Sequence, residues 1–122
     1  MIRLYHYSQA DFKDKIKVKF YGLNNYTFYD KNLTDIKRAF YYTKPEPEHF
    51  LKGSKFLYIT DYPKFRLYDI TKDLKGYLKD KTISKALSQI KQKYNGVIYR
   101  IGNSEIVNLF YDTRYIKQEV LR

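Results

Sequence analysis

The sequence has no cysteine, no tryptophan and only two histidines among its 122 residues. Without cysteine, a disulfide framework, a thiolate nucleophile and a cysteine-based zinc site are excluded. His6 and His49 are too few for a histidine-rich metal site, so we expect no bound metal. No apolar run approaches the ~20 residues that span a bilayer, and the N-terminus has no apolar stretch of the signal-peptide kind. We therefore expect a soluble, cytoplasmic protein that makes no membrane contact.

Acidic side chains are also few. The sequence has 13 Asp and Glu residues against 24 Lys and Arg residues, which gives a net charge of +11. Such an excess favours an acidic partner, namely nucleic acid, an anionic protein or a phosphate-bearing ligand. An AT-rich genome is the alternative source of the bias, because Lys, Asn, Ile and Tyr all have AT-rich codons.

Aromatic residues, in contrast, are abundant, with 15 Tyr and 8 Phe. Hydrophobic residues make up 43% of the sequence, which is typical of a globular and not of a disordered chain. Tyrosine has an apolar body and a polar tip, so it suits half-buried sheet faces and cleft walls. The length fits one domain. We therefore expect a single domain over residues 1–122, acting as a monomer.

Alternation of apolar and polar residues predicts most of the strands. Residues 2–7 form the first predicted strand. Residues 13–19 are predicted as an edge strand or an extended loop, because Ile16 and Val18 alternate with lysines. Further strands are predicted over 39–43, 56–60, 65–70, 97–99 and 106–111, the last two joined in a hairpin around Gly102.

Helical spacing is clearest over residues 82–93, where apolar residues recur at i, i+3, i+4 and i+7 and Gly96 marks the end. Shorter helices are predicted over 30–37 and after Thr71, a residue type that caps helices. This mixture of elements predicts an α+β domain with mostly antiparallel strand pairing.

Three segments, taken in order, bear on function. Residues 4–8 end the first strand and contain His6, residues 38–43 form a tyrosine-rich strand, and residues 94–117 contain a Gly-Val-Ile strand followed by Glu-Ile-Val. Together they resemble the ADP-ribosyltransferase superfamily, in the branch of the poly(ADP-ribose) polymerases, diphtheria-type toxins and small phage and toxin domains. The resemblance implies a split, mostly antiparallel sheet with short flanking helices around a cleft for NAD.

The resemblance also implies roles for single residues. His6 matches the first-strand histidine that contacts the adenosine-side ribose, and Ser8 matches the residue that contacts the nicotinamide amide. Tyr41 matches the ring that stacks on nicotinamide, and Tyr42 takes its place if the register is shifted by one. Tyr7 stands where the family has glycine.

The third segment supplies the catalytic acid of the resemblance. Counting back from Tyr111 places Val107 at the family's glutamate position, with Glu105 two residues earlier on the same strand face. A bulge or a different register assigns the role to Glu105, whose carboxylate would stabilise an oxocarbenium-like state; otherwise the site lacks its acid. Arg38 and Arg3 are the cations predicted to meet the NAD pyrophosphate.

The resemblance therefore implies a mono-ADP-ribosyltransferase that moves ADP-ribose from NAD, its substrate, to a host protein or nucleic acid, as an effector of a phage or mobile element. The same residues leave two alternatives. One is a non-catalytic module of this fold that binds nucleic acid or a protein partner through its lysines and tyrosines. The other is a structural phage or accessory protein that keeps only the fold.

Overall fold

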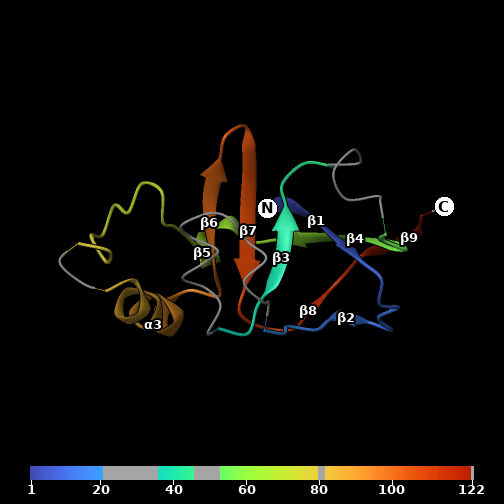
Figure 1. The fold of residues 1–122 in the computed structure, drawn as a ribbon, viewed down its shortest axis with the longest axis horizontal. Helices are drawn as coiled ribbons and strands as arrows, with labels where there is room; N and C mark the ends of the chain where they lie inside the picture. Colours follow the sequence, from blue (N-terminus) through green and yellow to red (C-terminus); the bar gives the residue numbers. More distant parts are fainter. Residues whose placement is uncertain (21–35, 46–52, 80–81, 122) are drawn as a thin grey trace.

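A computed structural model describes residues 1–20, 36–45, 53–79 and 82–121, and shows an α+β domain dominated by one sheet (Figure 1). The described elements are β1 (Ile2–Ser8), β2 (Lys15–Ile16), β3 (Ala39–Tyr42), β4 (Phe56–Tyr62), the 3-10 helix η1 (Lys64–Arg66), β5 (Leu67–Asp69), α3 (Ile83–Lys93), β6 (Gly96–Ile101), β7 (Ser104–Leu109), β8 (Thr113–Arg114) and β9 (Lys117–Val120). The predicted α+β class is confirmed.

The main sheet has seven strands in the order β5-β6-β7-β3-β1-β4-β9, and β2 pairs with β8 in a separate ribbon. Within the described strands, the β5–β6 pair is parallel and every other pair is antiparallel. The mostly antiparallel pairing expected from the sequence is therefore confirmed. The predicted hairpin joins β6 to β7, with Gly102 at φ 57° in its turn, a conformation that glycine adopts without strain.

The sheet is nearly divided between β1 and β3. Strand β1 pairs with β4 along its whole length, from Ile2 to Ser8, but it is in register with β3 at a single pair, Tyr5 and Tyr42. One half of the sheet is therefore β5-β6-β7-β3 and the other is β1-β4-β9. In Figure 1 the strands β6, β7 and β3 are drawn upright, whereas β4 runs across the view.

Alternation along the strands divides the core into two clusters. One contains Val97, Tyr99 and Ile106, and it packs against Leu87 and Ile90 of α3. The other cluster lies on the opposite sheet face and contains Leu4, Ile16, Ala39, Tyr41, Tyr58, Leu67, Ile98, Val107 and Leu109. The face that carries Tyr41 and Val107 is therefore the face without α3.

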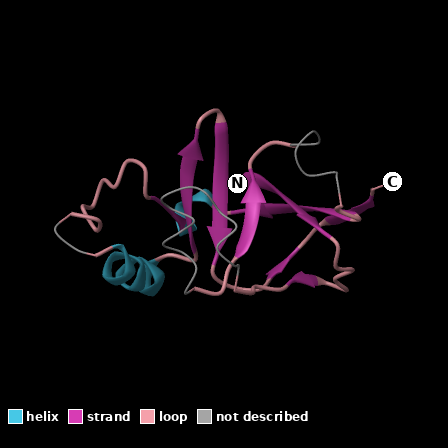
Figure 2. Cartoon of the chain, viewed as in Figure 1, coloured by secondary structure: helices cyan, strands magenta, loops and turns pink. Residues whose placement is uncertain are grey.

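Helix α3 confirms the prediction over residues 82–93. The hydroxyl oxygen of Thr82 accepts a hydrogen bond from the Lys85 N–H at 3.4 Å, which caps the helix N-terminus. The helix lies at the end of the molecule away from β9 (Figure 2). No helix among the described residues is both long enough and apolar enough to cross a membrane.

The helix predicted after Thr71 is wrong, because residues 71–79 form a series of turns. The Asp73 backbone has φ 44°, and its carboxylate accepts hydrogen bonds from the N–H groups of Tyr77 and Leu78. These local bonds compete with helical ones. Leu74 in this segment is 86% exposed, so it does not pack into the core. Of the helix predicted over 30–37, residues 30–35 lie outside the described residues, as does His49.

Candidate functional site

His6 is the centre of the candidate site. It lies in β1 and is 6% exposed, and its Nδ1 is 2.6 Å from the carbonyl oxygen of Phe40 in β3. Because a carbonyl oxygen only accepts, Nδ1 carries the proton and Nε2 keeps its lone pair. Burial lowers the pKa of His6 to about 4, against the opposing effect of the Phe40 bond and with help from the charge of Lys19. The imidazole is therefore neutral at pH 7, and its hydrogen bond crosses the seam of the sheet.

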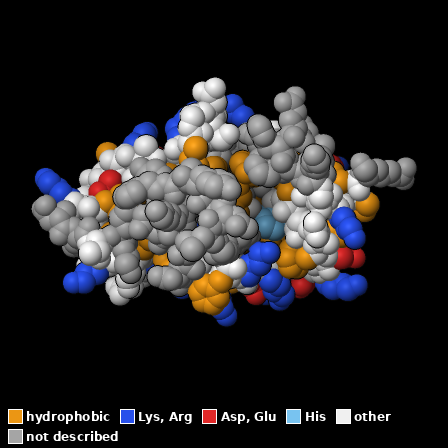
Figure 3. All heavy atoms as spheres, in the orientation of Figure 1, with side chains coloured by type: hydrophobic (Ala, Val, Ile, Leu, Met, Phe, Trp, Pro, Cys, Tyr) orange, Lys and Arg blue, Asp and Glu red, His pale blue; other side chains and the backbone are white. Residues whose placement is uncertain are grey.

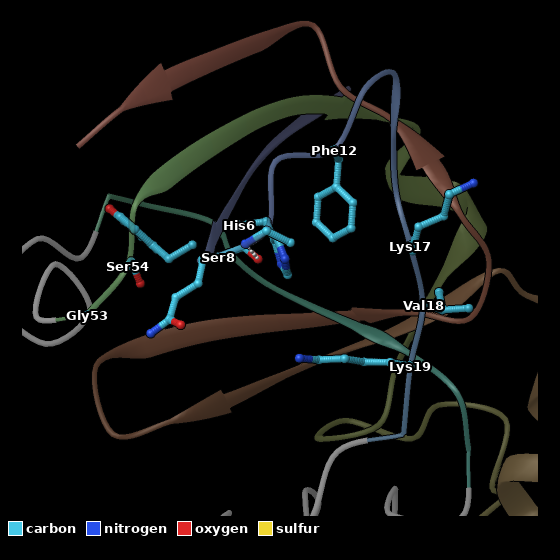
Figure 4. A pocket seen from close by; sticks show the side chains of 11 residues that line it. His6, Ser8, Phe12, Lys17, Val18, Lys19, Gly53 and Ser54 are labelled. Atoms are coloured by element: carbon cyan, nitrogen blue, oxygen red, sulfur yellow. Dashed lines mark hydrogen bonds between the residues drawn. The ribbon is translucent and has the colours of Figure 1, made fainter.

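A pocket of about 530 Å³ opens beside His6 (Figure 4). This volume lies within the ~300–1,000 Å³ of small-molecule sites. The lining residues are His6, Tyr7, Ser8, Gln9, Ala10, Phe12, Lys17, Val18, Lys19, Gly53 and Ser54. None of these carries a carboxylate. The described part of the pocket therefore favours an anionic ligand over a cationic one.

Two tyrosines hold the segment that forms one wall of the pocket. The Tyr58 hydroxyl donates to the Ala10 carbonyl at 2.5 Å and accepts from the Phe12 N–H at 2.8 Å. The Tyr115 hydroxyl donates to the Phe12 carbonyl at 2.6 Å, and the two tyrosine rings pack with centroids 4.7 Å apart. The wall is thus fixed by side chains from β4 and from the chain between β8 and β9.

The two tyrosines of β3 lie on opposite faces of the sheet. Tyr41 is fully buried, and its ring centroid is 5.3 Å from that of His6. Tyr42 packs instead against Tyr7 and Phe40, at centroid distances of 6.5 and 4.9 Å. The register thus brings Tyr41 together with His6, although Tyr41 lies behind it and does not line the pocket. The Tyr7 ring, which stands where the family has glycine, points to the face away from His6.

Glu105 lies in a different hollow from His6. Glu105 is the second residue of β7 and lies on the same strand face as Val107. Val107 is the registered partner of Tyr41. The Glu105 carboxylate is 3.9 Å from Nη1 of Arg100. The hollow has a volume of about 100 Å³ and is lined by Thr43, Lys44, Arg100, Asn103 and Glu105. The structure thus brings His6, Ser8 and Tyr41 together but leaves Glu105 at a neighbouring position along the sheet.

Neither of the two arginines predicted to meet a pyrophosphate lines the pocket. Arg38 is fully buried, and its Nη1 donates to Oδ1 of Asn108 at 2.5 Å. Asn108 in turn donates to the Tyr99 hydroxyl at 2.8 Å, so Arg38 belongs to a polar network inside the fold. Arg3 lies near the start of β1 and pairs with Asp61 at 2.9 Å.

Lysines supply the positive charge of the pocket instead. In Figure 4 the Lys19 side chain reaches across below His6, whereas the Lys17 side chain points away. The Lys17 ammonium is 3.6 Å from the Asp112 carboxylate, so part of its charge is neutralised. The alternating lysines of 13–19 were the signal for this wall, although their role at the pocket was not predicted. Gly53 and Ser54 gave no such signal.

Comparisons with protein-family models, with curated proteins and with solved structures find no significant match to this chain.

Proposed function

We propose that this chain binds NAD in the pocket beside His6 and transfers its ADP-ribose to a macromolecular acceptor, protein or nucleic acid. The observation that carries the proposal is the neutral first-strand His6, which packs beside Tyr41 at the wall of a pocket of about 530 Å³. These two residues belong to the segments that resemble ADP-ribosyltransferases. The near-division of the sheet between β1 and β3 adds support, because the resemblance implies a split sheet.

The pocket walls offer a group for each part of NAD. The Nε2 lone pair of neutral His6 accepts a hydrogen bond from a ribose hydroxyl. Ser8 offers its hydroxyl to the nicotinamide amide, and Phe12 offers an apolar ring face to a planar base. Lys19 offers its ammonium to the pyrophosphate, the role that the sequence had suggested for Arg38. Tyr41 supports the His6 ring from behind.

In the transfer, the bond between ribose C1′ and the nicotinamide nitrogen breaks, and its electron pair leaves with nicotinamide. The acceptor forms the new bond to C1′ and gives up a proton to solvent. Positive charge develops on the ribose as in glycoside chemistry, and Glu105 is the proposed carboxylate that stabilises it. The pair of Glu105 with Arg100 is partly exposed and worth ~0–1 kcal/mol. The carboxylate therefore leaves Arg100 at little cost.

The test uses NAD labelled on its adenylate part, incubated with the protein and a cell lysate. We expect label transfer by the wild type and a loss of about 10²–10³-fold in kcat for Glu105→Gln, the cost of removing one such electrostatic group. Glu119→Gln is the matched control, because Glu119 is also paired with a cation, Lys117 at 3.1 Å, but lies on the edge strand β9. Lys19→Ala should raise KM for NAD with little change in kcat.

The enzyme proposal would be refuted if the folded wild type, with the lysate present, gave no label transfer and released no nicotinamide. If Glu105→Gln transferred label as fast as Glu119→Gln, Glu105 would have no role in the reaction. Release of free ADP-ribose without transfer would instead assign NAD hydrolysis to the same pocket.

A second candidate is a module that binds NAD without turning it over. The observation that favours it is the placement of Glu105 in a hollow separate from the pocket, with its carboxylate toward Arg100. Calorimetry distinguishes the two candidates. For this second candidate, NAD binds to the wild type and to Glu105→Gln with the same affinity, and neither protein releases nicotinamide.

A further inference from the structure

The ribbon of β2 and β8 carries two facing cations. Lys15 and Arg114 are registered partners of an antiparallel pair, so their side chains project from the same face. Like charges directly opposite each other destabilise a strand pair. Among the described residues, no carboxylate lies within ion-pair distance of either cation. An anion lying over the ribbon would relieve this repulsion.

The row of positive charge continues from the ribbon to the pocket. Lys17 and Lys19 follow Lys15 at alternate positions and are exposed. Asp112 offsets part of the charge of Lys17. Lys19 lines the pocket. We call Lys15, Lys17, Lys19 and Arg114 the basic strip. In Figure 3, Lys and Arg side chains gather along the edge that carries β2 and β8, with a few acidic and hydrophobic side chains between them.

An exposed aromatic ring lies at the pocket end of the basic strip. Phe20 follows Lys19 and is 58% exposed. The Lys37 ammonium lies 5.6 Å from the centroid of its ring. Lys37 is held there because its neighbour Arg38 exchanges two backbone hydrogen bonds with Lys19. A flat exposed ring beside cations is the arrangement on which unpaired bases stack while phosphates meet the charges.

We infer that the basic strip and Phe20 bind single-stranded nucleic acid, with phosphates over Lys15 and Arg114 and a base on the Phe20 ring. This surface goes beyond the proposed transfer reaction, and its binding requires no NAD. The net charge of +11 adds attraction at longer range. Nucleic acid is favoured over an acidic protein because each of its nucleotides carries both an anion and a planar ring.

The experiment measures fluorescence anisotropy of a short labelled oligothymidylate over a salt series, without NAD. Each phosphate contact contributes a slope of about −0.7 in log K against log salt for a single strand. The double variant Lys15→Ala/Arg114→Ala should therefore flatten the slope by about 1.4 and weaken binding at low salt. The matched control is Lys64→Ala/Arg66→Ala on η1, which removes the same kinds of exposed charge elsewhere.

The aromatic contact has its own matched pair. Phe20→Ala should weaken binding by about 5-fold to 150-fold, since base stacking on an aromatic ring is worth ~1–3 kcal/mol. Phe65→Ala should not, although Phe65 is 78% exposed and also lies beside a cation, Arg66. Thermal melting verifies that every variant is folded.

Three outcomes would overturn the inference. The first is no binding of the oligonucleotide by the wild type at low salt. The second is an equal loss of affinity in the strip and η1 variants, which would assign the binding to net charge alone. The third is equally tight binding of polyglutamate or of a DNA duplex, which would make the partner an acidic protein or a double strand. Because NAD is absent throughout, failure of the proposed transfer reaction leaves this result unaffected.

Discussion

Acid should destabilise this protein through His6. The pKa of the buried imidazole is about 4 in the folded state, whereas an unfolded histidine titrates near ~6.5. Between these two values the unfolded chain binds a proton that the folded chain does not, so the free energy of unfolding falls as the pH falls. The contribution of neutral His6 to the free energy of unfolding is fully present above pH ~6.5. It is lost as the pH drops toward the folded pKa of His6.

The size of the effect follows from the two pKa values. One unit of difference between the folded and unfolded pKa corresponds to ~1.36 kcal/mol of stability. Lowering the pH from 7 to 5 covers most of the titration of His6 in the unfolded chain. We expect His6 to account for about 2 kcal/mol of lost stability over this interval. Urea unfolding at both pH values measures it for the wild type, His6→Gln and His49→Gln. Glutamine at position 6 keeps an N–H donor for the Phe40 carbonyl but does not titrate.

His49→Gln serves as the comparison for the pH dependence of unfolding, because it removes the second of the two histidines. His6→Gln should lose about 2 kcal/mol of this pH dependence. The same pH dependence in the wild type and His6→Gln would refute the reasoning. An NMR titration in which the His6 ring has its midpoint near ~6.5 would refute the reasoning independently.

Three further predictions concern packing and charge. Gly96→Ala should lower stability by about 1–3 kcal/mol in urea unfolding, because a Cβ there would lie 2.4 Å from a backbone carbonyl of β7; an unchanged midpoint contradicts this packing. Lys15→Glu should raise stability by about 0.2–1 kcal/mol over Lys15→Gln, because it places opposite charges across the ribbon beside Arg114; equal midpoints contradict it. Tyr58→Phe should cost about 1–3 kcal/mol and weaken NAD binding in calorimetry, because its hydroxyl holds two backbone groups of the pocket wall; unchanged stability and affinity contradict it.

Local patterns in the sequence predicted several elements of the fold. Alternation over 2–7 and 39–43 located β1 and β3, and the helical spacing over 82–93 located α3. The strand expected over 65–70 begins later, at Leu67, because η1 precedes it. It pairs in parallel with β6, which is distant in the sequence. Local patterns do not specify which strand becomes the neighbour.

The candidate site was predicted in part. His6 and Tyr41 share a sheet face, as strand alternation allowed. The burial of Arg38 depends on Asn108, which is distant in the sequence, so no local pattern signals it. The separation of Glu105 from the pocket depends on how the two halves of the sheet meet, which is a property of the tertiary structure. The turns around Asp73 replaced a helix because one carboxylate bonded two N–H groups.

The position of β1 within the sheet has a consequence for how the chain folds during synthesis. Residues 2–8 leave the ribosome before their pairing partners, the later strands β3 and β4. Strand β4 in turn keeps an open outer edge until residues 117–120 arrive as β9. An open edge is a template on which other chains pair. Nascent chains that stall between β4 and β9 should therefore be the species that aggregate and that chaperones engage.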